Sequence, residues 1–115
     1  MSVGEQENRR YPRALINRPG QVRVAAGPET NAQLIDVAEG GATLFCETPI
    51  DLGAEVELKF SLYTRKQAAC LVAGEVRHYF FNGKSHVIGV QFTRIDAETA
   101  QAIREFVRQT KVDTR

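Results

Sequence analysis

The chain has 115 residues, of which 43% are hydrophobic and 25% are charged, and its formal net charge at pH 7 is +1. This composition predicts a single globular domain with its own core, and it excludes both a disordered chain and a collagen-like repeat. The nearly balanced charge argues against a protein that coats a nucleic-acid polymer, because such domains are usually strongly basic.

Residues 1–8 are polar, and we expect them to form a flexible N-terminus ahead of a single domain over residues 9–115. The first residues include no apolar leader, and no window approaches the roughly 18 apolar residues that a membrane span needs. We therefore expect a cytoplasmic protein that does not insert directly into a membrane.

Positive charge is concentrated in the stretch "ENRRYPRALINRPGQVRV", residues 7–24, which holds Arg9, Arg10, Arg13, Arg18 and Arg23. Pro12 opposes a helix here, so we expect a loop over residues 9–19. In an extended segment the Cα atoms of Arg9 and Arg13 lie roughly 13 Å apart. Two guanidinium groups at that separation can close on a ligand from different sides, and they pair well with phosphate oxygens or with guanine. On this segment alone, arginines that only keep a frayed terminus soluble are an equally good interpretation.

The same loop suggests a conformational switch. If the chain from Arg9 to Arg18 is mobile without a ligand, binding must order it. We therefore expect backbone amides from Tyr11 to Leu15 to gain hydrogen-exchange protection when the ligand binds.

Short alternating patterns follow over about residues 20–94 and predict a barrel or sandwich of half-buried strands. The clearest case is "EVELKFSL", where Val56, Leu58, Phe60 and Leu62 share one face. Further strands are expected at "QVRV", "NAQLIDVA", "ATLFC", "ACLVAGEVRHYFF" and "SHVIGVQFT". No helical crossover separates these six strands, so the sheet should be antiparallel.

The last two strands are joined by Asn82-Gly83, a dipeptide that predicts a two-residue type I′ hairpin turn. The run His78-Tyr79-Phe80-Phe81 precedes it, and strict alternation would turn two of these side chains outward. We favour packing of the aromatic rings under the C-terminal helix. The alternative is an exposed interaction surface.

Between two of the strands, "LIDVAEGGATL" places Asp36 near a strand end and Gly40 and Gly41 at the following turn. Glycine there permits positive φ or the close approach of another backbone or a flat ligand. A carboxylate beside it can accept hydrogen bonds from guanine N1–H and the N2 amine. Taken alone, an ordinary turn with a glycine bulge is the better interpretation of this stretch.

The hydrophobic period changes to about 3.6 residues after Thr93, which predicts one helix over about residues 96–110. Asp96 is a good N-cap, and Glu98 complements the positive end of the helix dipole. One apolar stripe is formed by Ala100, Ile103, Phe106 and Val107. The opposite face carries Arg104, Glu105 and Arg108, which we expect to be solvated.

In this order and spacing, the two motifs resemble those of the PilZ domain family, bacterial receptors for the second messenger cyclic di-GMP. Arg9 and Arg13 match its R-x-x-x-R motif, and Asp36 and Gly41 match the ends of its [D/N]-x-S-x-x-G motif. The similarity continues into the late strand pair, with a G-x-x-F strand end at residues 89–92, and into the final helix.

The resemblance implies an all-β fold with one helix, namely a six-stranded antiparallel β-barrel with a C-terminal α-helix and no catalytic centre. It implies that Arg9 and Arg13 clamp the ligand, that Asp36 contacts a guanine edge and that Gly41 preserves the backbone shape. Arg10 matches no fixed family position but adds charge or stacks on a base. It also implies a receptor that signals to an unidentified downstream protein, because we find no output domain in this sequence.

One position departs from the family pattern, because Ala38 stands where the second motif has serine. A lost neutral hydrogen bond is worth about 0.5 to 1.5 kcal/mol, roughly a two- to twelve-fold change in affinity. Weaker binding is therefore expected. The alternative is a PilZ-like protein-interaction adaptor that no longer binds cyclic di-GMP.

Enzymatic and metal-binding functions are not expected. Neither Cys46 nor Cys70 belongs to a C-x-x-C pair or a Cys/His cluster, so we expect buried, reduced thiols. The histidines, His78 and His86, suit strands better than a catalytic set. We therefore predict no cofactor, no metal and no nucleic-acid polymer as partner.

Overall fold

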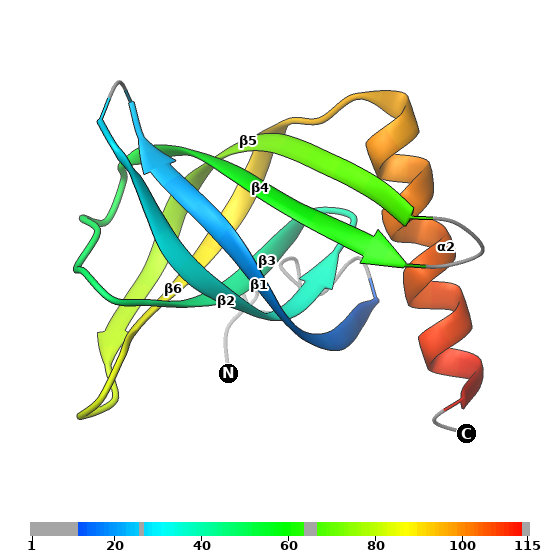
Figure 1. The fold of residues 1–115 in the computed structure, drawn as a ribbon, viewed down its shortest axis with the longest axis horizontal. Helices are drawn as coiled ribbons and strands as arrows, with labels where there is room; N and C mark the ends of the chain where they lie inside the picture. Colours follow the sequence, from blue (N-terminus) through cyan, green and yellow to red (C-terminus); the bar gives the residue numbers. More distant parts are fainter. Residues whose placement is uncertain (1–11, 26, 64–66, 114–115) are drawn as a thin grey trace, which may run out of the picture.

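The computed structural model of the chain describes residues 12–25, 27–63 and 67–113. It holds the strands β1 (Arg13–Val24), β2 (Glu29–Ala38), β3 (Gly41–Cys46), β4 (Glu55–Tyr63), β5 (Gln67–Phe81) and β6 (His86–Arg94), followed by the helix α2 (Ala97–Asp113). The strands form a closed barrel in the order β1-β2-β3-β6-β5-β4, and every pairing is antiparallel. The predicted fold class is therefore confirmed (Figure 1).

The barrel is filled by the inward side of each alternating strand. In β4 the burial pattern follows the sequence residue by residue, because Val56, Leu58, Phe60 and Leu62 are all buried. The largest fully buried side chains of the other elements are Leu34, Leu44, Ile88 and Ile103. Antiparallel strands with one buried and one solvated face give this pattern, and the core is a single cluster.

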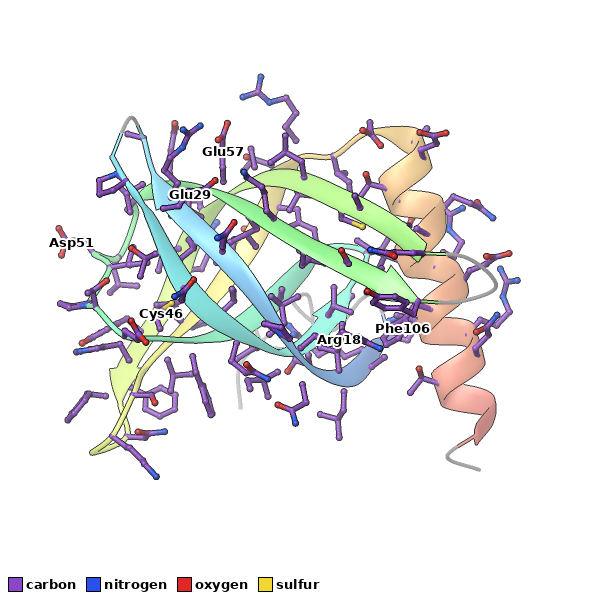
Figure 2. The ribbon with its side chains drawn as sticks, viewed as in Figure 1. Arg18, Glu29, Cys46, Asp51, Glu57 and Phe106 are labelled. Atoms are coloured by element: carbon purple, nitrogen blue, oxygen red, sulfur yellow. The ribbon has the colours of Figure 1, made fainter. Side chains whose placement is uncertain are left out.

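The helix α2 covers one end of the barrel, where it packs against β1, β2, β4 and β5 (Figure 1). Ile103 and Val107 of the predicted stripe are buried, and Phe106 packs against the core between the helix and the barrel (Figure 2). The backbone N–H of Thr99 donates a hydrogen bond of 2.7 Å to Asp96 Oδ1, which confirms the predicted N-cap. This contact is the main cause that lowers the pKa of Asp96.

The first strand begins earlier than expected, because β1 starts at Arg13 and not near residue 20. Ala14 is buried in the core, and Arg13 pairs with Ala38 of β2. The expected loop is therefore wrong for residues 13–19, which belong to β1, and the predicted gain of hydrogen-exchange protection from Tyr11 to Leu15 stays a prediction. The apolar pattern was hard to follow there because β1 bulges between Leu15 and Arg18, which shifts the alternation.

The β5–β6 hairpin is confirmed, but its predicted turn type is wrong. Phe81 pairs with His86, so the loop is longer than two residues, and only Gly83 in it has positive φ. The Oδ1 atom of Asn82 accepts hydrogen bonds from the backbone N–H groups of Lys84 and Ser85, at 2.9 and 2.7 Å. This side-chain cap replaces the backbone geometry of a type I′ turn.

The aromatic run at this hairpin does not pack under α2, so our favoured interpretation is wrong. Tyr79, Phe80 and Phe81 are exposed at 36%, 57% and 55%. The hairpin extends past the barrel at the end away from the helix, which explains why the helix does not cover these rings (Figure 1).

Both cysteines are free and buried, as expected. Burial raises the pKa of Cys46 to about 11. Burial, followed by the negative charge of Asp96, raises the pKa of Cys70 to about 11. These thiols behave as small core side chains and not as nucleophiles. In the part of the chain that the structure describes, no helix has the length and apolarity to cross a membrane.

Candidate functional site

Asp36 lies on the outer face of the barrel because β2 carries one extra residue just before it. Leu34 and Val37 are both fully buried although they are three positions apart. The register of β2 against β3 shifts between Leu34 and Asp36, which leaves Ile35 as the extra residue. Without this bulge, period two would turn Asp36 inward with Leu34. The bulge thus directs a carboxylate to the surface.

Arg13 meets this carboxylate from the neighbouring strand. In the β1–β2 pair, Arg13 lies opposite Ala38 and Leu15 lies opposite Asp36. The Nη1 atom of Arg13 donates a hydrogen bond of 2.9 Å to Asp36 Oδ1. The structure therefore brings together two of the predicted site residues that are far apart in the sequence.

Two more predicted residues continue the same cross-strand row. Ala38 pairs with Arg13 on one side and with Gly41 on the other. Gly41 in turn pairs with Gln91 of β6. Partners directly opposite in an antiparallel sheet share a face, so Arg13, Ala38 and Gly41 belong to one outward row. Ala38 is only 3% exposed, so this row is closely packed at its centre.

The reason for glycine at position 41 is the close approach of a backbone and not positive φ. Among the described glycines, only Gly53 and Gly83 have positive φ. A Cβ atom added to Gly41 would collide with the carbonyl oxygen of Val90 in β6. Of the two reasons considered for this position, close approach is confirmed and positive φ is wrong.

The turn between β2 and β3 is fixed by contacts with α2 and β6. Arg104 Nη2 donates a hydrogen bond of 2.6 Å to Glu39 Oε2, and this bond raises the pKa of Arg104. The backbone N–H of Phe92 donates to the carbonyl oxygen of Gly40 at 2.9 Å. Arg104 is exposed, as expected, but it also joins the helix to the second motif.

The remaining arginines of the N-terminal stretch divide into two groups. Arg18 stacks over the Tyr63 ring of β4, with its Cζ atom 4.2 Å from the ring centroid. Arg23 pairs with Glu57 of β4 at 2.5 Å. Both therefore have structural partners on the other side of β1. Arg9 and Arg10 lie outside the described residues, so their clamp role stays a prediction.

Sequence reasoning missed four side chains that share this outer face, namely Thr43, Arg77, His78 and Gln91. Thr43 pairs with Asp36 and with Gly89, and Gly89 pairs with His78, which makes a second row. Arg77 Nη1 donates to Gln91 Oε1 at 2.5 Å. Alternation from Gly41 in β3 could have placed Thr43 on this face. The placement of Arg77 and His78 could not be read from alternation, because it depends on a register shift between Val76 and His78.

We call the outer side of these two rows the β1–β2–β3–β6 face and define it by Arg13, Asp36, Ala38, Gly41, Thr43 and Gln91. It combines a guanidinium group, a carboxylate and neutral hydrogen-bonding groups over a close-packed sheet. Such a face can bind a ligand that carries both anionic groups and hydrogen-bond donors. Among the residues described, no group of three or more His, Cys, Asp or Glu side chains is placed to hold a metal ion.

Comparison with solved structures shows the same architecture in several bacterial proteins. Bacillus subtilis inhibitor of motility, MotI/DgrA, matches with a TM-score of 0.83 and 16% identity over 93% of this chain and 53% of that one. The PilZ domain of YcgR from Escherichia coli, solved with c-di-GMP, matches with a TM-score of 0.68 and 13% identity over 93% of this chain and 94% of that one. The K. pneumonia MrkH–c-di-GMP complex matches with a TM-score of 0.68 and 15% identity over 92% of this chain and 52% of that one.

These identities establish the shared fold alone. The chain spans about half the length of MotI/DgrA and MrkH. A search among curated protein sequences finds no significant match. A family model described as "PilZ domain" matches residues 7–109, which include both motifs and reach into α2. Because that match covers nearly the whole chain, the protein belongs to the PilZ domain family.

Proposed function

We propose that this chain is a receptor for cyclic di-GMP that binds the dinucleotide on the β1–β2–β3–β6 face. The observation that carries the proposal is the contact between Arg13 and Asp36, which unites one residue of each motif at 2.9 Å. Support also comes from similar folds solved with this ligand, namely those of YcgR and MrkH. PilZ domains act as receptor or adaptor domains, so the proposal requires no catalytic group.

Arg13 and Asp36 suit two different parts of the ligand. A guanidinium group has five N–H donors, and the hydrogen bond to Asp36 uses one of them. The others can point at phosphate oxygens or at guanine O6 and N7. The carboxylate can accept from guanine N1–H and the N2 amine. The ion pair holds both groups in place before the ligand arrives, which lowers the entropy cost of binding.

Arg9 and Arg10 supply the second half of the clamp in this proposal. They precede β1 by only a few residues, so they can fold over the same face from the chain end beside Arg13. Residues 13–18 already belong to β1. In this proposal, the segment that ligand binding orders therefore lies ahead of Pro12. In this proposal Gly41 has a supporting role, because the absence of a Cβ atom lets the Val90 backbone of β6 come close to the row that holds Arg13 and Ala38.

Calorimetric titration with cyclic di-GMP tests the proposal. We expect measurable binding by the natural chain and a loss of roughly 10- to 150-fold in affinity for Arg9→Ala and for Arg13→Ala, since each removes a charge-assisted hydrogen bond. Arg23→Ala is the matched control, because Arg23 lies on the same strand but pairs with Glu57. Equal heats for the natural chain, Arg9→Ala and Arg13→Ala would end the clamp hypothesis.

A second candidate function is an adaptor that binds no nucleotide. Ala38 favours it, because the family serine is absent from the centre of the row. The exposed aromatic rings of the β5–β6 hairpin favour it as well, since such rings often mark interfaces. The same titration separates the candidates, because the adaptor should give no heat at micromolar ligand. In both cases we propose that a separate downstream protein receives the signal.

A further inference from the structure

The β5–β6 hairpin presents apolar rings on both of its sides. Tyr79, Phe81 and His86 share one side, where Tyr79 Oη and His86 Nδ1 lie 2.7 Å apart. The His86 ring stacks on Tyr79 at 5.9 Å and contacts Phe81 at 4.9 Å between ring centroids. Phe80 lies on the opposite side of the strand and is 57% exposed. The rings of Tyr79, Phe81 and His86 are thus held in a fixed arrangement, while Phe80 and Phe81 keep more than half of their surface in contact with solvent.

The hairpin is also positively charged. The sequence from Val76 to Ile95 has no acidic residue, and Lys84 is exposed at the end of the hairpin. Arg77 is exposed as well, but it lies 3.9 Å from Glu75 and contacts Gln91 on the outer face. Among the ion pairs between described residues, none includes Lys84. An exposed, basic and aromatic hairpin is suited to an apolar surface that has carboxylates beside it.

The chain itself carries such a surface in the connection between β3 and β4, residues 47–54. This segment has two acidic residues, Glu47 and Asp51, and no basic one, and both are exposed. Leu52 is 63% exposed, which makes it the most exposed large hydrophobic side chain described after Leu15. None of the ion pairs between described residues includes Glu47 or Asp51.

The hairpin and this acidic loop occupy the same end of the barrel. Cys46, directly before the loop, pairs with His86, the first residue of β6 after the hairpin turn. The backbone N–H of Gly53 donates to the carbonyl oxygen of Val76, where the hairpin leaves the barrel. Figure 2 shows Asp51 at the end opposite α2, on the side where the hairpin projects. Opposite charges and exposed apolar side chains therefore lie side by side at one end of one molecule.

We propose that two copies of this chain associate end to end through this surface. A two-fold axis would place the hairpin of each copy against the acidic loop of the other, so that Lys84 faces Asp51 and Phe81 faces Leu52 twice. A two-fold interface requires such a self-complementary patch. The proposal does not depend on nucleotide binding, since the β1–β2–β3–β6 face contributes no residue to it.

A lipid surface fits these observations less well. The four residues beyond the rings, Asn82 to Ser85, form a folded polar tip that would have to enter the hydrocarbon first. Glu47 and Asp51 at the same end would be repelled by anionic headgroups.

The expected dimer is weak. Three aromatic side chains that are about half exposed offer about 300 Å² of surface in total, which is well below the roughly 800 Å² per partner of a standard interface. We therefore expect an equilibrium between monomer and dimer and not a permanent assembly.

Analytical ultracentrifugation of the natural chain without nucleotide tests the proposal, over roughly 10 μM to 1 mM, the range of weak dimers. We expect sedimentation to shift from monomer towards dimer with concentration. Phe81→Ser should weaken association at least tenfold, because a buried anchor is lost twice in a two-fold interface. Leu71→Ser is the matched control, since Leu71 is 56% exposed on β5 but pairs with Lys59 of β4 in the barrel wall. It should leave association unchanged.

A charge exchange makes the test specific for the proposed contact. Lys84→Glu and Asp51→Lys should each weaken the dimer roughly two- to thirty-fold, as each alters an exposed ion pair twice. The double variant should restore it. A chain that stays monomeric at all concentrations would overturn the proposal, and so would a double variant no better than the single ones. Co-sedimentation of a monomeric chain with phosphatidylglycerol vesicles, abolished by Phe81→Ser, would show a lipid surface instead.

Discussion

At Asp36, one extra residue in a strand determines which groups the side chain meets. In a regular strand the carboxylate would share the core with Leu34, where an unpaired charge costs several kcal/mol or forces protonation. The bulge at Ile35 turns it outward, towards Arg13. A small irregularity therefore converts a destabilising buried position into a surface position that is paired with Arg13.

Ala38 allows the missing family serine to be tested by restoring it. Ala38 lies between Arg13 and Gly41 in the outward row, so a hydroxyl group there would reach the ligand of the proposed receptor. We expect Ala38→Ser to raise affinity for cyclic di-GMP roughly two- to twelve-fold, the worth of one neutral hydrogen bond. Titration calorimetry measures the change.

The control adds the same hydroxyl group elsewhere. Ala69 is exposed on β5, opposite Ser61 of β4, so Ala69→Ser should leave the affinity unchanged. If Ala38→Ser bound more weakly than the natural chain, the family serine could not be a ligand contact at this position, and the backbone at the end of β2 would be the part that matters.

Among the elements, β4 and α2 were the most predictable because their own side chains carry the full signal. Val56 to Leu62 alternate without a break, and Asp96 caps the helix at the predicted residue. The start of β1 was not predictable, since the bulge after Leu15 interrupts the alternation. The turn type at Asn82 was not predictable either, because a hydrogen bond to its side chain determines the conformation of the loop.

The candidate site was predictable to a lesser degree than the elements. The motifs pointed to Arg13, Asp36 and Gly41, but only strand register could show that they lie in neighbouring rows. The same holds for Gln91, which reaches the face only through its pairing with Gly41. Pairing partners are distant in the chain, so local periodicity carries no information about them.

We expect the contribution of the Asp96 cap to the stability of α2 to depend on pH. The carboxylate of Asp96 accepts from the backbone N–H of Thr99, which lowers its pKa below the ordinary value near 4. When the pKa of a carboxyl group is lower in the folded state than in the unfolded state, the group stabilises the fold fully at pH values above its unfolded pKa. This stabilisation is lost as the pH falls through the folded pKa. We therefore expect Asp96→Ala to reduce the thermal midpoint at pH 7 and to have less effect below about pH 4.

Asp96→Ser is the control for this experiment. Serine caps a helix without a titrating group. Asp96→Ser should therefore keep most of the thermal stability that the natural chain has at pH 7, and the contribution of the cap should no longer change at acid pH. Thermal melts by circular dichroism at a series of pH values measure both. If the thermal midpoints of the natural chain and of Asp96→Ala differed by the same amount at every pH, the result would contradict a charged cap.

For the whole molecule, closure of the barrel makes the two thiols reporters of global opening. Cys46 lies in β3 and Cys70 in β5, on strands that β6 separates, and both are buried in one core cluster. With a pKa of about 11 each, only about one thiol in a thousand is ionised at pH 8, against about one in ten at the ordinary value of 9.0. Folding should therefore slow labelling at least 100-fold, before steric protection is counted.

Labelling with a thiol reagent at pH 8, followed by mass spectrometry of the peptides, measures each cysteine separately. A closed sheet has no free edge from which one strand can detach, so both thiols should react at the rate of global unfolding. Cys46→Ala and Cys70→Ala give each rate without interference from the other. If one thiol reacted as fast as in the denatured chain while the other stayed protected, its strand would open by itself, and the barrel would not behave as one cooperative unit.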